Sequence, residues 1–265
     1  MKLLTLYNIT LALLPTLVAC SKTDYLDTNA RDRAPLSASI RFVNARPVNV
    51  PLQFWTFTTQ VTNSAVGINE ASPYLPATFG NVQINFTEGA STSYKASRQF
   101  GNQATFSANG GPNGPVAGYY HTVFAAQSST QSGKDTLILF YDNLENPPAA
   151  KARLRFVHLA PGLPDLSLRL QSPERDTLLF ASVKYGSAGG AVLSGEGLNV
   201  WSLGPFSTVD TGTVTLKVSR AAGQQPVDLQ NGSTIHLSAG KIYTVFLNGI
   251  PDNKSATGAY TIIHN

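Results

Sequence analysis

The stretch RLRFVHLAP, residues 153–161, has the pattern of an apolar strand that runs into a proline turn. The stretch SIRFVNARP, residues 39–47, repeats this pattern in the first half of the chain. The same spacing aligns Leu52 with Leu166, so that an alternating strand follows the turn in both places. Such self-similarity predicts that the chain contains two copies of one structural unit.

A second shared motif comes near the end of each copy. Residues 118–126, GYYHTVFAA, match residues 240–248, GKIYTVFLN, and one more apolar strand follows each. Between the motifs lie short runs of period-two alternation, without the sustained spacing and caps of a helix. About seven short strands in each copy favour two packed sheets. We expect an all-β fold with two tandem antiparallel β-sandwich domains of the immunoglobulin-like kind.

The composition is typical of an exported β-rich protein. The 265 residues are 42% hydrophobic and only 13% charged, and 22 glycines and 16 prolines provide for many turns. The formal net charge is +4, but the lysines and arginines are scattered rather than grouped with aromatic residues. A nucleic-acid partner is therefore not expected.

The first residues predict a secretory signal with a lipid attachment site. Lys2 precedes a mostly apolar run, residues 3–19, which is short for a membrane span and suits a signal peptide. The run ends at Cys20, the only cysteine, and the tetrapeptide LVAC resembles the lipobox of bacterial lipoproteins. In such proteins the cysteine thiol is diacylated and becomes the new N-terminus. Each buried methylene of the acyl chains would contribute about 0.8 kcal/mol to membrane binding.

These features divide the chain into four expected parts. Residues 1–19 are the signal peptide, and residues 20–36 are the lipidated cysteine with a flexible polar tether. Residues 37–145 and 146–265 are the two β-sandwich domains, joined by a proline-containing linker. We expect an outer-membrane location with a lipid anchor at Cys20, on either the cell surface or the periplasmic face. A soluble secreted protein with an incidental cysteine is the alternative.

Three segments of the second copy carry a resemblance to a known family. They are ARLRFVHLAPGLPDLSLRL, KYGSAGG and LSAGKIYTVFLNG, and they resemble the domain-of-unknown-function family 4397. The resemblance covers residues 150–265 well and residues 37–145 more weakly. Domains of this family occur in exported bacterial proteins and lipoproteins, often in tandem. The resemblance implies a β-sandwich and a place in the cell envelope, and it implies no particular activity.

The sequence contains no local motif for catalysis or metal binding. The four histidines form no HxH, HxxxH or HExxH pair, and a second cysteine is absent. The glycine-rich residues 186–190 lack the lysine that ends a phosphate loop, and no G-x-S-x-G motif occurs. We therefore expect a protein that is not an enzyme, with no catalytic residue, metal ion or cofactor.

The polar residue of the repeated strand is His158 in the second copy and Asn44 in the first. Both side chains can form hydrogen bonds with the backbone of the proline turn that follows. We therefore interpret this position as one that holds the turn in place. A polar site formed by His158 and Asp165, just beyond the same turn, is the alternative.

The aromatic residues are the best candidates for binding. A long glycine-rich loop, residues 107–120, ends at Tyr119 and Tyr120, and Trp201 occupies the middle of the second copy. Exposed rings beside a loop can stack on sugars or peptides, although tryptophans of a sandwich more often fill its core. The expected function is a non-catalytic structural or adhesion module with a glycan or protein partner. The alternative is a carbohydrate-binding accessory lipoprotein that uses these rings.

Overall fold

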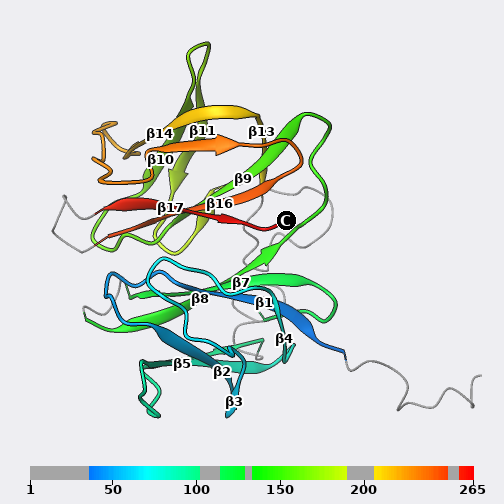
Figure 1. Cartoon of the computed structure of the whole chain (residues 1–265). Helices are drawn as coiled ribbons and strands as arrows, with labels where there is room; N and C mark the ends of the chain where they lie inside the picture. The colour runs from blue at the N-terminus through cyan, green and yellow to red at the C-terminus, as the bar shows by residue number, and fades with distance from the viewer. Residues whose placement is uncertain (1–35, 102–113, 129–132, 190–205, 250–256) are drawn as a thin grey trace, which may run out of the picture. The chain divides into compact units, whose positions relative to one another are not determined.

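The two copies of the repeated stretch form β1 (Ala38–Asn44) and β9 (Lys151–His158), each at the centre of a sheet (Figure 1). The computed structural model describes residues 36–101, 114–128, 133–189, 206–249 and 257–265. Every helix or strand in this part of the chain is a β-strand. The prediction of an all-β chain is therefore confirmed. No helix in the described ranges is long and apolar enough to cross a membrane.

The first copy forms two four-stranded sheets, with the orders β4-β1-β7-β8 and β3-β2-β5-β6. The remaining strands of this copy are β2 (Leu52–Thr56), β3 (Thr59–Gln60), β4 (Leu75–Ala77), β5 (Val82–Glu88), β6 (Ala96–Phe100), β7 (Tyr120–Gln127) and β8 (Asp135–Asp142). Alternate side chains of both sheets point inward and form one hydrophobic core, as expected of a sandwich.

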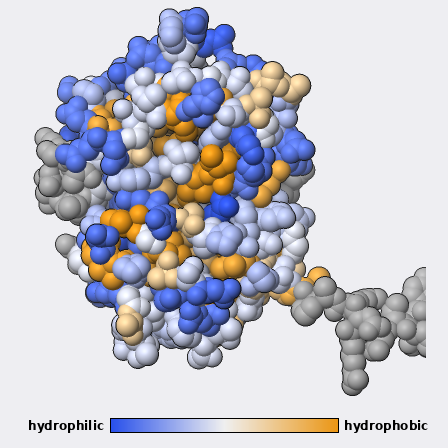
Figure 2. All heavy atoms as spheres, in the orientation of Figure 1, coloured by the Kyte–Doolittle hydropathy of each residue, from blue (hydrophilic) through white to orange (hydrophobic). Residues whose placement is uncertain are grey.

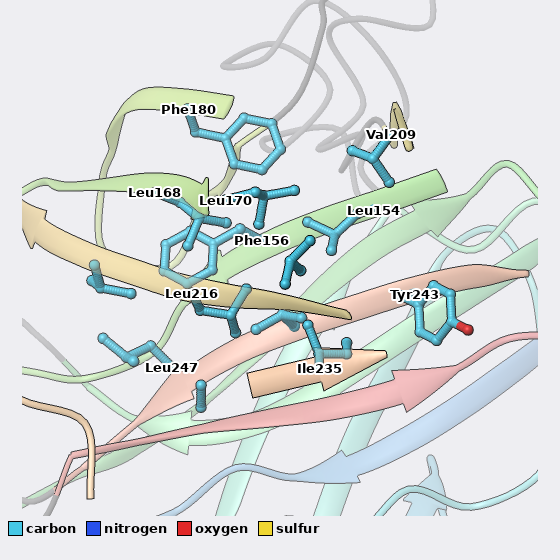
Figure 3. Close-up of a cluster of buried hydrophobic side chains, with 14 of the residues drawn as sticks. Leu154, Phe156, Leu168, Leu170, Phe180, Val209, Leu216, Ile235, Tyr243 and Leu247 are labelled. Carbon is cyan, nitrogen blue, oxygen red and sulfur yellow. The ribbon is translucent and has the colours of Figure 1, made fainter. Parts of the chain in front are cut away.

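The second copy repeats this arrangement with the sheets β12-β9-β16-β17 and β11-β10-β14-β15, and β13 also pairs with β9. Its further strands are β10 (Leu166–Gln171), β11 (Asp176–Val183), β12 (Ala188–Gly189), β13 (Ser207–Asp210), β14 (Gly212–Arg220), β15 (Thr234–Leu237), β16 (Ile242–Asn248) and β17 (Gly258–Ile263). Leucine, valine and phenylalanine side chains from both sheets fill the space between them (Figure 3).

One detail differs from the expected antiparallel sandwiches. β1 pairs in parallel with β7, and β9 pairs in parallel with β16, while the other strand pairs are antiparallel. A tight turn reverses the chain and so gives antiparallel neighbours. β1 and β7 are joined instead through the strands of the opposite sheet, which allows β7 to return in the direction of β1.

A third hydrophobic cluster joins the two sandwiches. It lies between β1, β7 and β8 of the first copy and β9, β16 and β17 of the second. Its buried members are Val43, Ala45, Phe124, Ala126, Phe140, Val157, Leu159, Phe246 and Ile262. These sheets are therefore covered on both faces, and all seven residues of β16 are buried. Residues 36–265 form one compact unit. The sheets of the two copies separate between Asp142 and Lys151, while the independence of the predicted domains stays a prediction.

Candidate functional site

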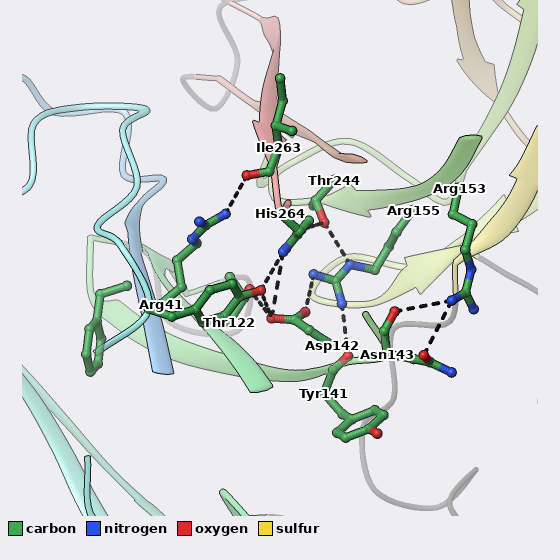
Figure 4. Close-up of polar contacts among 12 residues, drawn as sticks. Arg41, Thr122, Tyr141, Asp142, Asn143, Arg153, Arg155, Thr244, Ile263 and His264 are labelled. Carbon is green, nitrogen blue, oxygen red and sulfur yellow. Dashed lines mark hydrogen bonds and ion pairs between the residues drawn. The ribbon is translucent and has the colours of Figure 1, made fainter. Parts of the chain in front are cut away.

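Beside this third cluster, a group of buried polar side chains connects the two sandwiches (Figure 4). Asp142 ends β8 of the first copy, Arg155 belongs to β9 of the second, and His264 directly follows β17. Their exposed fractions are 1%, 0% and 6%. Burial of so many polar groups is costly unless they pair with each other.

The pairing closes into a ring of five side chains. Arg155 Nη2 lies 2.7 Å from Asp142 Oδ1, and Arg155 Nε donates to Thr244 Oγ1 at 3.1 Å. The two nitrogens of His264 continue the ring, with Nε2 2.7 Å from Thr244 Oγ1 and Nδ1 2.5 Å from Tyr74 Oη. Tyr74 Oη donates to Asp142 Oδ2 at 2.9 Å. Every member is thereby bonded to two others.

The hydrogen positions follow from this pattern. Because Tyr74 donates its hydroxyl hydrogen to Asp142, its oxygen accepts a hydrogen from His264 Nδ1. The Nε2 atom of a neutral imidazole then accepts the hydroxyl hydrogen of Thr244. Burial, with Arg155 as a further cause, lowers the pKa of His264 to about 3, despite the nearby carboxylate of Asp142. A neutral His264 therefore completes the ring.

The charges within the ring are balanced. Burial opposes ionisation of Asp142, but the guanidinium of Arg155 and the hydroxyl donors Thr122 and Tyr74 outweigh it and lower the pKa of this carboxyl group. Burial and the carboxylate of Asp142 raise the pKa of Tyr74 well above its ordinary value. Near neutral pH the ring thus holds one carboxylate, one guanidinium and neutral partners. Its groups are occupied with each other, and the arrangement stabilises an interface rather than presenting a reactive group.

The two copies contribute to this interface in equivalent ways. Arg41 of β1 donates to the carbonyl oxygen of Ile263 at 2.8 Å. Arg155, at the same position of β9, donates to the carbonyl oxygen of Tyr141 at 3.1 Å. Each arginine therefore reaches the last strand of the other copy. Reciprocal contacts of this kind are those of an isologous dimer, here formed within one chain.

The aromatic neighbours of the two arginines are also equivalent. The guanidinium of Arg41 lies 4.4 Å from the ring centre of Tyr74, and that of Arg155 lies 4.4 Å from the ring centre of Phe206. Tyr74 and Phe206 differ in one respect, because Tyr74 has a hydroxyl group and Phe206 has none. The pseudo-symmetric interface therefore contains one asymmetric polar ring.

His158 makes the backbone hydrogen bonds expected of a turn-fixing side chain. Its Nδ1 accepts from the N–H of Ala160 at 3.3 Å, and its Nε2 lies 3.1 Å from the carbonyl oxygen of Pro164. Asn44 does the same in the first copy, where Oδ1 accepts from the N–H of Arg46 and Nδ2 donates to a carbonyl oxygen six residues on. Burial lowers the pKa of His158 and keeps it neutral.

The structure does not join His158 to Asp165 as a site. Asp165 accepts a hydrogen bond from Ser182 at 3.0 Å, and within the described residues neither a hydrogen bond nor an ion pair connects it to His158. His158 is fully buried, so it faces the turn rather than solvent.

Tyr119 and Tyr120 lie at the start of β7 and are 47% and 42% exposed. The ring of Tyr119 is 5.5 Å from that of Tyr141, and the ring of Tyr120 is 5.0 Å from that of Tyr74. The two predicted residues therefore form a surface group of tyrosines next to the buried ring. Cys20 and Trp201, the other two predicted residues, lie outside the described residues.

The second sandwich contains an open cleft of about 740 Å³ between the β10–β11 hairpin and the β13–β14 connection. Core residues, among them Leu170 and Val214, form its floor. Lys151 and Arg175, which also line the cleft, both pair with Asp210. No three histidine, cysteine or acidic side chains approach each other closely enough for a metal ion in the part of the chain that the structure describes.

Sequence reasoning did not identify the ring. Its members are isolated polar residues in apolar strands, and Tyr74 and His264 are 190 positions apart. One signal was present, because both copies of the repeated strand carry an arginine among buried apolar residues. A charged residue in a strand buried on both faces requires a partner.

Two of the solved structures that resemble this chain are distant likenesses. One is CBMbc, of family CBM26, from Eubacterium rectale Amy13K in complex with maltoheptaose, at 11% identity and a TM-score of 0.22, covering 84% of this chain and 96% of that chain. The other is a candidate cell adhesion protein from Bacteroides eggerthii, at 9% identity and a TM-score of 0.20, covering 86% and 95%. Likenesses this weak carry no argument about fold or ligand. No curated protein matches the chain.

A family model does match the chain. The match covers residues 38–169, from β1 to β10, and so includes the whole first copy and the first two strands of the second. The sequence resemblance was instead strongest over the second copy. The family match and the sequence resemblance both include the repeated strand and its proline turn. The chain belongs to the domain-of-unknown-function family DUF4397.

Proposed function

We propose that this protein is a lipid-anchored component of the cell envelope in which two β-sandwiches act as a non-catalytic interaction module with a structural or adhesion role. Cys20 holds the acyl chains, and residues 21–36 keep the sandwiches clear of the outer membrane. Protease treatment of intact cells distinguishes the cell surface from the periplasmic face.

This proposal rests on one observation: the side chains best suited to acid–base chemistry are bonded to each other inside the interface. Asp142, His264 and Tyr74 would suit acid–base chemistry, but they are bonded to each other and to Arg155 inside the interface. Groups that act on a substrate need access to it. In this protein the buried ring instead holds the two sandwiches together as one body, which supports a role in binding or structure.

The test is fractionation and protease treatment of intact cells that express the chain or its Cys20→Ala variant. The wild-type chain is expected in the membrane fraction and the variant in the soluble fraction. Digestion from outside would place the protein on the cell surface, and protection would place it on the periplasmic face. Equal solubility of the two chains would contradict the lipid anchor.

A second candidate function is carbohydrate binding by a lipid-anchored accessory protein. The exposed rings of Tyr119 and Tyr120 favour it, since such rings can stack on sugars; Trp201 is the third residue of this hypothesis. A Tyr119→Ala/Tyr120→Ala variant is expected to lose retardation on gels that contain a bound polysaccharide. Unchanged retardation would remove these tyrosines from the binding site.

A further inference from the structure

The outer face of the β3-β2-β5-β6 sheet differs from the other exposed strands in its chemistry. The core residues Phe54 and Ile84 point inward, so alternate residues of the same strands point outward. The outward side chains of the four strands are Gln53, Trp55, Gln60, Gln83, Asn85, Thr87, Ser97 and Gln99. None of these is charged, and all except the buried Asn85 and Thr87 are at least partly exposed. In the space-filling view, the end of the molecule near β3 is mostly blue and white, which marks hydrophilic to neutral residues (Figure 2).

The second copy does not repeat this chemistry. In the first copy Trp55 of β2 pairs with Asn85 of β5. In the second copy the equivalent strands pair Arg169 with Lys217, and Arg169 also forms an ion pair with Asp176 at 2.8 Å. The duplicated sheet has therefore become charged in one copy and uncharged in the other. The outward residues do not pack in the core, so the core does not explain their difference in charge.

The amide side chains on this face hold each other in place. Gln60 Nε2 donates to Gln53 Oε1 at 3.0 Å, and Gln83 Nε2 donates to Asn85 Oδ1 at 2.9 Å. A primary amide has two donor hydrogens and an oxygen with two lone pairs, so Gln53, Gln60 and Gln83 retain groups for a ligand. Asn85 is fully buried and instead holds Gln83 in place. The pairs thus present oriented donors and acceptors, and their orientation costs little entropy on binding.

Three aromatic rings accompany these amides. The rings of Trp55 and Tyr94 are 6.1 Å apart in an edge contact. Phe57 and Tyr94 are 44% and 40% exposed. Tyr94 Oη donates to the carbonyl oxygen of Phe57 at 2.9 Å, and Asn85 Nδ2 donates to the same oxygen at 2.7 Å. The three rings and the amides therefore belong to one connected surface.

The backbone at Phe57 holds the exposed ring in an unusual turn conformation. Phe57 is the first residue of the two-residue turn between β2 and β3, and its φ is +50°. Glycine is the usual residue with a positive φ in such turns, and a bulky residue there is strained. An exposed phenylalanine gains nothing from the core that would offset this strain. Strain of this kind is typically retained at binding sites.

We propose that this face, made of the outward residues of β2, β3 and β5 with Phe57 and Tyr94, binds an uncharged glycan. The rings stack on the C–H faces of sugars, and the amides pair with sugar hydroxyls, which both donate and accept. An anionic ligand would require cationic side chains, and the outward residues include none. The proposal rests on the binding role proposed above and places it on a face distinct from Tyr119 and Tyr120.

The test is affinity electrophoresis of the mature chain in gels that contain starch, galactomannan, mixed-linkage β-glucan or xyloglucan, with polygalacturonate as the charged comparison. At least one neutral polysaccharide is expected to retard the wild-type chain. Phe57→Gly should weaken this binding by about fivefold or more, since a stacked ring contributes of the order of 1 kcal/mol. Its melting temperature should not fall, because glycine adopts a positive φ without strain.

Gln224→Gly is the matched control. Gln224 is also an exposed residue with a positive φ, of +49°, but it belongs to the second copy. This change removes the same strain without removing a ring, so retardation should stay at the wild-type level. If Phe57→Gly lowers the melting temperature, the retardation of a Gln60→Ala variant is measured instead. This change shortens an exposed side chain of the face and should also weaken binding.

Three results would overturn the proposal. They are no retardation of the wild-type chain by any neutral polysaccharide, equal retardation of the wild-type chain and the face variants, and retardation by polygalacturonate alone. If the Tyr119→Ala/Tyr120→Ala variant loses binding while Phe57→Gly keeps it, glycan binding stands and this face is wrong. Failure of the lipid anchor at Cys20 would not alter any of these results.

Discussion

At the scale of single residues, the duplication shows which side-chain properties a position requires. His158 and Asn44 differ in size and chemistry, yet each accepts a hydrogen bond from the N–H two residues on and bonds a carbonyl oxygen six residues on. What this position requires is one acceptor and one donor at the right separation. A role as general base or as an imidazole metal ligand would require histidine in both places, and Asn44 cannot take that role.

A substitution series at His158 tests this interpretation. His158→Asn should cost less than about 1 kcal/mol of unfolding free energy, because Asn44 already fills the same role. His158→Ala should cost about 2–3 kcal/mol, because it leaves the buried N–H of Ala160 without its acceptor and removes the partly buried hydrogen bond to the carbonyl oxygen of Pro164. Urea denaturation measures both. Equal costs would show that hydrogen bonding is not what the position supplies.

The ion pair of the ring allows a second test at this scale. Arg155→Met leaves the carboxylate of Asp142 buried without a cation, and such a loss typically costs about 3–5 kcal/mol. The control is Arg169→Met, which breaks an exposed pair with Asp176 and should cost less than about 1 kcal/mol. Denaturant midpoints distinguish the two. Similar costs would mean that solvent reaches the interface.

At the scale of strands and turns, the local patterns predicted the elements and the long-range contacts decided their pairing. Both copies of the repeated strand were recognisable from alternation and the proline turn. The parallel pairing of β1 with β7 was not, because it depends on a path through the opposite sheet. The contact between the turn before β15 and the start of β17 likewise joins residues distant in the chain, and the local pattern does not show it.

Gly232 tests that contact. A Cβ atom at Gly232 would lie 1.7 Å from the carbonyl oxygen of Ala259, at a φ of +67°. Gly223 has a φ of +76° but nothing within 4 Å of such an atom. Gly223→Ala should therefore cost only the local strain, about 1–2 kcal/mol, and Gly232→Ala clearly more. Thermal unfolding of the two variants gives the comparison, and equal losses would refute the close approach.

At the scale of the whole molecule, the two similar sandwiches form one body with an interface between them. The apolar cluster around Phe124 and Phe246 and the polar ring beside it bury the central sheets on both faces. Histidines buried in this way connect the stability of residues 36–265 to pH.

Acid should destabilise the folded chain before the carboxylates titrate. Burial lowers the pKa of His264 to about 3 and that of His121 to about 4, while unfolded histidines titrate near 6.5. Between these values the unfolded chain binds more protons, so the free energy of unfolding falls as the pH is lowered. The fall is up to about 1.4 kcal/mol per pH unit for each histidine. Melting temperatures from pH 7 to pH 4.5 measure it, and a flat profile would contradict neutral buried histidines.

The sequence by itself determined the strand and turn that occur twice, the all-β fold and the turn-fixing role of the His158 position. These follow from periodicity and turn chemistry, which depend on neighbouring residues. Only the tertiary structure decided the parallel pairs, the ring around Asp142 and Arg155, and the uncharged face at Phe57. Each of these brings together residues that are distant in the chain, and a strand pattern shows which residues are buried without showing what they meet.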